Sequence, residues 1–168
     1  KIITVIGFPL GANFSYIKAQ EAKECIEAGA DEVDMVIDIY SLKNAKYTQY
    51  QNDIKAVVDA AFDIPVKTIL ETDYLTKDEI ATGALRAAQA GASFIKTSTG
   101  YAKNGVGAKV EDIKIIKEVL SFDFKEVKIK ASGGIKTYND AKALIDAGAD
   151  RLGTSSGIEI LRGEKEDV

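Results

Sequence analysis

Three stretches of this sequence, "EAGADEVDMV" (27–36), "QAGASFIKTS" (89–98) and "DAGADRLGTS" (146–155), are variants of one pattern. In each, a helix-like segment ends at a glycine and a strand-like run follows almost at once. Gly29, Gly91 and Gly148 stand where a helix typically closes with a residue in the left-handed region. The repeat predicts helix-to-strand units, and such alternation favours a parallel sheet with right-handed crossovers.

The periodicity of apolar residues extends this alternation through the whole chain. The segments "TKDE" (76–79) and "TYND" (137–140) have the pattern of a capping box at two helix starts. Six strands fit either an open doubly wound sheet or a TIM (β/α)8 barrel that lacks two strands. The strands are expected near residues 1–8, 32–39, 66–72, 93–98, 127–132 and 151–154, and the helices near 15–28, 43–61, 76–90, 109–121 and 137–147.

The composition bounds the function classes. The 168 residues are 46% hydrophobic and 29% charged, which is typical of one globular domain. The net charge of −4, with both signs interspersed, predicts no nucleic-acid partner and no membrane surface, and no apolar run approaches the ~20 residues of a membrane helix. With Cys25 as the single cysteine and no histidine, an intrachain disulfide, the usual zinc sites and Ser-His-Asp chemistry are excluded. We expect a cytoplasmic protein without a metal site.

Lysines lie within strands that otherwise read as buried. Because side chains alternate along a strand, Lys96 and Lys130 point away from the helices, late in their strands and just before Thr/Ser/Gly-rich loops. Asp34 has the same inward parity in its own strand. Parallel α/β folds place their sites at these carboxyl ends. Lys67 and Lys128 stand at strand starts and are interpreted as solvated surface lysines.

Two ammonium groups close together in a buried site predict amine chemistry. Burial and like-charge repulsion both lower the pKa of a lysine, by up to ~3–5 units for a fully buried group. A neutral amine is a nucleophile that forms a Schiff base with a carbonyl. We interpret Lys96 as this nucleophile, Lys130 as the neighbour that depresses its pKa and passes protons, and Asp34 as the group that orients that lysine or a water.

Three glycine-containing loops follow the late strands: "STG" (98–100), "SGGIKT" (132–137) and "GTSSG" (153–157). Glycine lets backbone amides approach an anion closely, and barrels commonly hold phosphate on the loops after their last two strands. These loops therefore predict a phosphate site. Glu71 shares the inward parity of its strand, and two readings stay open for it: a carboxylate that supports the site, or a structural ion pair.

Six motifs occur in an order that resembles the deoxyribose-phosphate aldolase family: "TVIGFPLGA", "GADEVDMVI", "ILET", "FIKTSTG", "KASGGI" and "GTSSG". The resemblance covers nearly the whole chain. It implies a TIM barrel that reversibly cleaves the small sugar phosphate 2-deoxy-D-ribose 5-phosphate into D-glyceraldehyde 3-phosphate and acetaldehyde, with no metal and no organic cofactor.

The family's functional residues carry over motif by motif. The resemblance implies that Lys96 in "KTSTG" forms the Schiff base, with Lys130 from "KASGG" and Asp34 at the end of "DEVD" as its catalytic partners. It also implies a set of phosphate-binding residues. These are Gly100, Gly133, Gly134, Gly153, Ser155 and Ser156.

The chain departs from the family pattern in two places. The elements that carry the family's first two strands, an Asp-His-Thr motif and a Cys-Val-Asn-Pro type motif, do not occur, so we expect residues 1–168 to form a single barrel domain that is incomplete at its amino terminus. Tyr101 stands where family members often have a lysine. A homodimer and a homotetramer are both candidate assemblies.

Two alternatives remain at this stage. One is another phosphate-binding barrel lyase or isomerase, with Glu71 as the base. The other is an inactive fragment whose exposed sheet edges are filled by a partner chain.

Overall fold

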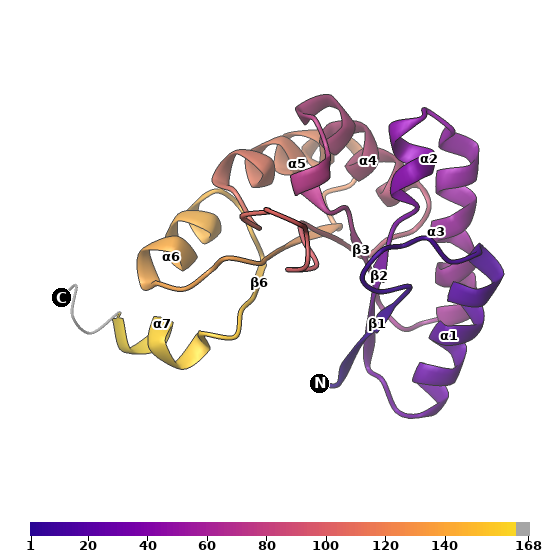
Figure 1. The fold of residues 1–168 in the computed structure, drawn as a ribbon, viewed down its shortest axis with the longest axis horizontal. Helices are drawn as coiled ribbons and strands as arrows, with labels where there is room; N and C mark the ends of the chain where they lie inside the picture. The colour runs from indigo at the N-terminus through magenta and orange to yellow at the C-terminus, as the bar shows by residue number, and fades with distance from the viewer. Residues whose placement is uncertain (164–168) are drawn as a thin grey trace.

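The computed structural model describes residues 1–163 and has an α/β fold with one parallel sheet (Figure 1). The strands are β1 (Ile3–Ile6), β2 (Glu32–Val36), β3 (Val66–Ile69), β4 (Phe94–Lys96), β5 (Lys128–Ser132) and β6 (Arg151–Gly153). The helices are α1 (Ser15–Glu27), α2 (Ile39–Lys43), α3 (Tyr47–Ala61), the 3-10 helix η1 (Thr72–Tyr74), α4 (Lys77–Gln89), α5 (Val110–Asp123), α6 (Tyr138–Asp146) and α7 (Gly157–Gly163).

The six strands pair in sequence order, from β1 to β6, and every pair is parallel. In Figure 1 the helices form an arc around the outside of the strands, and the arc is open between β1 and α7. The sheet is therefore a half-barrel. The repeated helix-to-strand pattern correctly predicted a parallel sheet with helices between its strands. None of the helices within residues 1–163 combines the length and the apolar character that crossing a bilayer requires.

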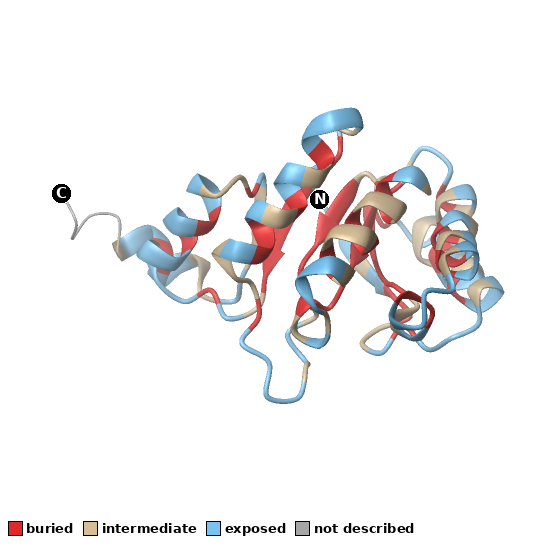
Figure 2. Ribbon diagram, turned by 90° about the horizontal axis from the view of Figure 1, so that it is seen from above, coloured by how far each residue is buried: buried red, intermediate tan, exposed pale blue. Residues whose placement is uncertain are grey.

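The main core lies between the convex side of the sheet and the helices. Figure 2 shows buried residues on the strands and on the helix sides that face them, with exposed residues on the outer helix surfaces. Val33, Met35 and Ile95 from the strands are fully buried there, together with Ile54 from α3 and Ile113 from α5. This is the hydrophobic layer expected when helices cover one face of a parallel sheet.

The helix boundaries confirm the two capping boxes and correct one prediction. The side chain of Thr76 accepts a hydrogen bond from the Glu79 amide and Glu79 returns the bond, and Thr137 and Asp140 do the same at α6. The single helix predicted over 43–61 is wrong. The chain makes α2 and α3 instead, because Asp38 caps α2 early and Ala45 adopts a left-handed φ of 54° between the two helices.

The strands are shorter than predicted at their carboxyl ends. The strand expected over 66–72 ends at Ile69, and the strand expected over 93–98 ends at Lys96. The segments that follow turn across the mouth of the half-barrel. This places Glu71 and the start of the "STG" loop outside the regular sheet, where their side chains shape the site described next.

Candidate active site

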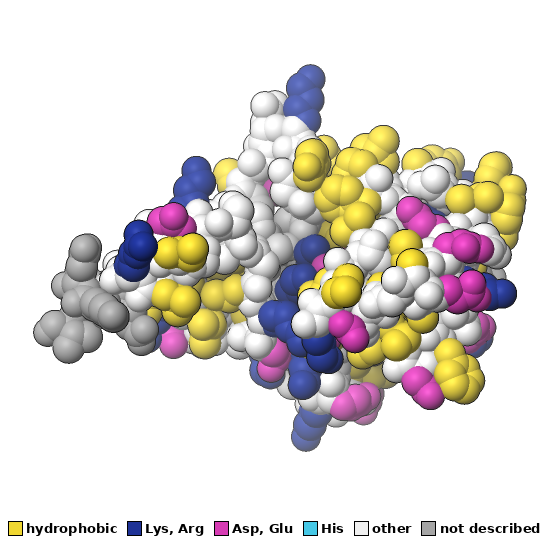
Figure 3. All heavy atoms as spheres, turned by 90° about the horizontal axis from the view of Figure 1, so that it is seen from below, with side chains coloured by type: hydrophobic (Ala, Val, Ile, Leu, Met, Phe, Trp, Pro, Cys, Tyr) yellow, Lys and Arg dark blue, Asp and Glu magenta, His cyan; other side chains and the backbone are white. Residues whose placement is uncertain are grey.

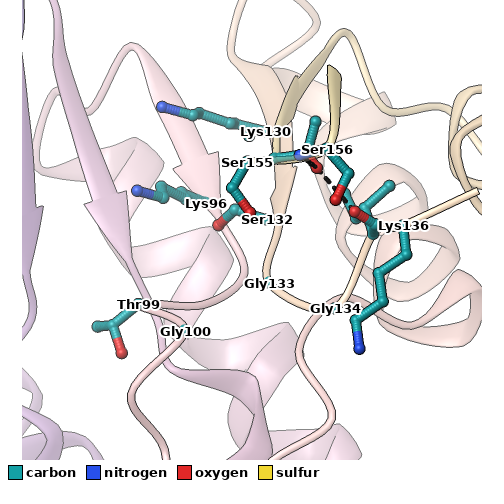
Figure 4. A pocket seen from close by; sticks show the side chains of 13 residues that line it. Lys96, Thr99, Gly100, Lys130, Ser132, Gly133, Gly134, Lys136, Ser155 and Ser156 are labelled. Atoms are coloured by element: carbon teal, nitrogen blue, oxygen red, sulfur yellow. Dashed lines mark hydrogen bonds between the residues drawn. The ribbon is translucent and has the colours of Figure 1, made fainter. Parts of the chain in front are cut away.

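The three predicted catalytic side chains meet on the concave face of the sheet. Lys96 on β4 and Lys130 on β5 are register partners, so their side chains leave neighbouring strands at the same level (Figure 4). Each Nζ donates a hydrogen bond of 2.8 Å to Oδ2 of Asp34 on β2. The lysines are 8% and 7% exposed and Asp34 is 1% exposed. Two ammonium groups thus share one carboxylate oxygen in a site largely shielded from water.

A third lysine, which sequence reasoning placed wrongly, completes this charge cluster. Lys67 was interpreted as a solvated lysine at a strand start, but its side chain is fully buried. Its Nζ lies 2.9 Å from Asp34 Oδ1 and 2.6 Å from Glu32 Oε2. The start of a strand inside a curved sheet faces the interior rather than solvent, and the two carboxylates of β2 supply its counter-charges. Lys128, at the start of β5, is exposed as predicted.

The cluster continues toward the amino ends of the strands. Glu32 is 1% exposed and also pairs with Arg151 on β6 and with Lys1. Lys67 and Arg151 both lie over the ring of Phe94, at 5.6 and 4.9 Å from its centroid. Figure 3, seen from the open side of the arc, shows Lys and Arg side chains gathered near the middle of this face. The signal in the sequence was the spacing of Glu32 and Asp34, two acidic residues on the same face of one strand.

The electrostatics of the cluster follow from burial and from the shared charges. Burial lowers the pKa of Lys130, and the nearby Lys96 and Lys67 lower it further, while Asp34 opposes both effects. Burial acts to raise the pKa of Asp34, but the three lysines outweigh it and hold that pKa below its ordinary value. The same balance holds the pKa of Glu32 low, with Lys67, Lys1 and Arg151 as its partners. Both carboxylates are therefore ionised at neutral pH, and Lys130 is the amine whose lowered pKa the structure explains.

A pocket of about 380 Å³ opens directly beside the two lysines. All six residues predicted to bind phosphate line it, and Lys96 and Lys130 reach it as well, whereas Asp34 lies behind the lysines. The full lining consists of Lys96, Thr99, Gly100, Lys130, Ser132, Gly133, Gly134, Ile135, Lys136, Gly153, Thr154, Ser155 and Ser156. The predicted nucleophile and the predicted anion loops therefore share one cavity.

Free backbone donors distinguish this pocket. Within residues 1–163, the amides of Gly100, Gly133 and Gly134 donate to no protein acceptor. Gly133 and Gly134 have φ values of 84° and 74°, and a Cβ at Gly134 would stand 2.2 Å from the carbonyl oxygen of Val106. Glycine is needed there for the close contact between the two loops. Unpaired amides on such turns are suited to hold the oxygens of an anion.

Lys136 is a pocket residue that sequence reasoning missed. It follows the two glycines in "SGGIKT" and lines the pocket, although its amine points away from Lys96 and Lys130 in Figure 4. It supplies a positive charge at the loop end of the cavity, opposite the end at which the two lysines stand. The signal in the sequence was its position two residues after Gly134, in a loop already predicted to bind an anion.

Of the two readings left open for Glu71, the structure favours a carboxylate that supports the site, because it bonds Thr99 of the pocket lining and forms no ion pair within residues 1–163. Its Oε1 accepts a hydrogen bond of 3.1 Å from the Thr99 amide, and its Oε2 accepts a short one from the Thr99 hydroxyl. The residue is 2% exposed and does not line the pocket. Both carboxylate oxygens are thus occupied by the "STG" loop, an arrangement that does not favour Glu71 as a catalytic base.

Comparison with known proteins identifies the family of the chain. A sequence model described as "DeoC/LacD family aldolase" matches residues 1–163. The chain belongs to this aldolase family. A deoxyribose-phosphate aldolase from Exiguobacterium sp. strain AT1b is 52% identical over 167 residues, which are 99% of this chain and 73% of that protein.

Solved structures of similar proteins share the fold. A putative deoxyribose-phosphate aldolase from Coccidioides immitis is 42% identical with a TM-score of 0.93, over 97% of this chain and 64% of that one. The chain thus spans a little under two thirds of that protein's length. A deoxyribose phosphate aldolase from Aeropyrum pernix, described as having a unique tetrameric structure, is 31% identical with a TM-score of 0.87, over 100% of this chain and 69% of that one. The family assignment therefore agrees with the resemblance carried by the sequence motifs.

Proposed function

We propose that this chain carries the active site of a Schiff-base aldolase that reversibly cleaves 2-deoxy-D-ribose 5-phosphate into D-glyceraldehyde 3-phosphate and acetaldehyde. The observation that carries the proposal is the pairing of Lys96 and Lys130 on one oxygen of Asp34, at one end of a pocket whose other end presents free glycine amides. An amine for a carbonyl and a cradle for a phosphate are the two recognition features that this substrate requires.

In the cleavage direction, the neutral amine of Lys96 attacks the C1 aldehyde of the open-chain sugar, and loss of water gives a protonated imine. This imine accepts the electron pair of the C2–C3 bond as the C3 hydroxyl loses its proton, so D-glyceraldehyde 3-phosphate leaves. The enamine that remains takes up a proton at C2, and hydrolysis of the imine releases acetaldehyde and regenerates Lys96. Lys130, with its lowered pKa, and Asp34 move these protons.

The phosphate is assigned to the loop end of the pocket. Gly100, Gly133 and Gly134 contribute free amides, and Gly153, Ser155 and Ser156 surround the same cavity. A phosphate held there keeps the sugar in the pocket while its C1 end reaches the lysines. Such positioning converts a bimolecular attack into an effectively intramolecular one.

Covalent trapping tests the assignment directly. The protein is treated with acetaldehyde and borohydride, digested, and mapped by mass spectrometry. We expect one adduct, on Lys96, that is absent in Lys96→Ala and retained in Lys67→Met. An adduct on Lys130 would exchange the roles of the two lysines, and the absence of any adduct together with cleavage of the sugar phosphate would refute Schiff-base chemistry.

We infer that the half-barrel is part of an eight-stranded TIM barrel in which two further strands lie between β6 and β1. Support comes from the open arc in Figure 1 and from the half-exposed inward side chains of Ile3 and Val5 on edge strand β1. The motif order assigns the two strands to the amino-terminal side of β1. A turnover assay on residues 1–168 separates an active aldolase from an inactive fragment, and light scattering decides whether it assembles into a dimer or a tetramer.

A further inference from the structure

The loop between β4 and α5 determines the shape of the pocket. Thr99 and Gly100, near its start, line the cavity. Its later part packs closely against the glycine loop after β5. A Cβ at Gly107 would stand 2.3 Å from the carbonyl carbon of Gly133. A shift of this loop therefore moves two of the backbone segments that present free amides to the pocket.

Four consecutive residues after β3, Glu71 to Tyr74, hold this loop along its whole length, and we call them the 71–74 clamp. Glu71 accepts both hydrogen bonds of Thr99 at the loop start. At the loop end, Asp73 accepts hydrogen bonds of 2.8 Å from the Gly107 amide and 2.9 Å from Lys109 Nζ. In the middle of the loop, the hydroxyl of Tyr74 accepts a hydrogen bond of 2.9 Å from the amide of Lys103.

Glu71 is the most unusual member of the clamp. Its φ of 58° lies in the left-handed region, which non-glycine residues occupy at a cost of about 1–3 kcal/mol unless the surroundings enforce it. It is also a nearly fully buried carboxylate directly behind a pocket that we assign to an anion. By charge alone Glu71 weakens anion binding, so its placement needs another reason.

The hydrogen bonds supply that reason. Because Glu71 takes up the amide and the hydroxyl proton of Thr99, the Thr99 hydroxyl oxygen is turned to accept a 2.9 Å bond from the Tyr101 amide. The amides of Thr99 and Tyr101, on either side of Gly100, thus both have hydrogen-bond acceptors within the protein. The Gly100 amide between them stays unpaired. The carboxylate thus selects which backbone donor faces the pocket.

We propose that Glu71 is a positioning residue for phosphate binding, which acts by locking Thr99 and thereby presenting the Gly100 amide to the pocket. The proposal rests on the function proposed above and adds a residue that touches neither the sugar phosphate nor the reacting atoms. It makes a prediction of opposite sign to simple electrostatics: replacing this carboxylate by a side chain that accepts no hydrogen bond from Thr99 weakens phosphate binding instead of strengthening it.

The test measures phosphate affinity in four forms of the protein: wild type, Glu71→Ala, Glu71→Gln and Tyr74→Phe. Inorganic phosphate is titrated and followed by protein NMR, with circular dichroism as the check of folding. Because Glu71→Ala frees Thr99 and the Gly100 amide to rotate away from the pocket, we expect at least a tenfold higher Kd, which equals about 1.4 kcal/mol of binding free energy. Glu71→Gln keeps an acceptor for the Thr99 amide and is expected to recover most of the affinity.

Tyr74→Phe is the matched control, because it releases the loop at a point that does not line the pocket, and its Kd is expected to stay within about twofold of the wild type. An unchanged or lower Kd in both Glu71 variants would overturn the proposal. So would a wild-type protein that binds no phosphate. An equal loss of affinity in Tyr74→Phe would assign the effect to general loosening of the loop and would also overturn it.

Kinetics give a second readout that a merely structural role does not produce. In Glu71→Ala the KM for 2-deoxyribose 5-phosphate is expected to rise about tenfold, with kcat/KM for unphosphorylated 2-deoxyribose unchanged. Equal losses on both substrates contradict the inference. If the wild type binds phosphate but cleaves neither sugar, the proposed aldolase function fails, and the phosphate titration still decides the role of Glu71.

Discussion

Replacing Asp34 by asparagine tests the charge cluster on which the site depends. Three amines lie within 2.8–2.9 Å of the Asp34 oxygens: Lys67 on Oδ1, and Lys96 and Lys130 on Oδ2. In Asp34→Asn the side-chain amide keeps one acceptor oxygen. It cannot accept from Lys67 and from the Lys96–Lys130 pair at the same time, and it carries no charge. Removing one partner of a buried ion pair costs about 3–5 kcal/mol, a large share of the ~5–15 kcal/mol stability of a typical domain. We expect a loss of this size at pH 7.

The pH dependence of the loss identifies its cause. In the wild type the lowered pKa of Asp34 means that its contribution is complete above the ordinary pKa of aspartate, ~4, and is lost as the pH falls through the lowered value. In Asp34→Asn the Lys130 amine loses the carboxylate that opposes the effect of burial, so its pKa in the folded state falls further. The unfolded state then binds more protons between that value and ~10.4, so the variant regains stability as the pH rises from 7 to 10.

Urea denaturation at pH 4, 7 and 10 is the assay, with Asp59→Asn as the control. Asp59 pairs with Lys55 on the helix surface, where both side chains are more than half exposed, and its loss is expected to cost no more than about 0.5 kcal/mol. The reasoning is refuted if Asp34→Asn loses less than about 1 kcal/mol at pH 7, or if its deficit stays constant up to pH 10.

Further predictions follow from single contacts. Lys130→Met removes a buried amine with a lowered pKa while Asp34 keeps Lys67 and Lys96 as partners, so we expect about 1 kcal/mol more stability in urea at pH 7, a gain that disappears as the pH approaches the ordinary lysine value. Gly134→Ala forces a Cβ to 2.2 Å from the carbonyl oxygen of Val106 at a φ of 74°; we expect a loss of about 1–3 kcal/mol and no thermal protection by phosphate. Tyr50→Phe removes a buried hydroxyl that donates to the Gly83 carbonyl at 3.0 Å, and about 1–2 kcal/mol of stability in urea should be lost, whereas wild-type stability would contradict this bond.

The sequence predicted the parts of the fold that depend on local patterns. The alternation of strands and helices, the helix starts at Thr76 and Thr137, and the inward direction of Lys96, Lys130 and Asp34 follow from periodicity, capping residues and strand parity. The grouping of the glycine loops around one pocket followed from their common place at the carboxyl ends of strands. Each of these inferences needs only residues that lie near one another in the chain.

The features that were wrong or missed depend on contacts between distant residues. Lys67 reads as a surface lysine until Glu32 and Asp34, on another strand, are placed beside it. The break between α2 and α3 depends on a left-handed Ala45, a conformation that no residue preference indicates. The bonds from Glu71 to Thr99 join residues 28 positions apart. Contacts between segments far apart in the chain decided all of these except the helix break, and a single sequence contains little information on such contacts.

The sequential order of the strands has a consequence for biosynthesis. From β2 to β6, each strand pairs with the one translated immediately before it, so this part of the sheet grows without waiting for a distant segment. Every completed unit offers the next one a finished edge, and extension from β1 to β6 needs little of the long-range loop closure that slows many β-rich proteins. The two lysines are translated one unit apart, and their common carboxylate has by then already left the ribosome. Growth of the polypeptide from β1 to β6 thus assembles the charge cluster from its anion outward.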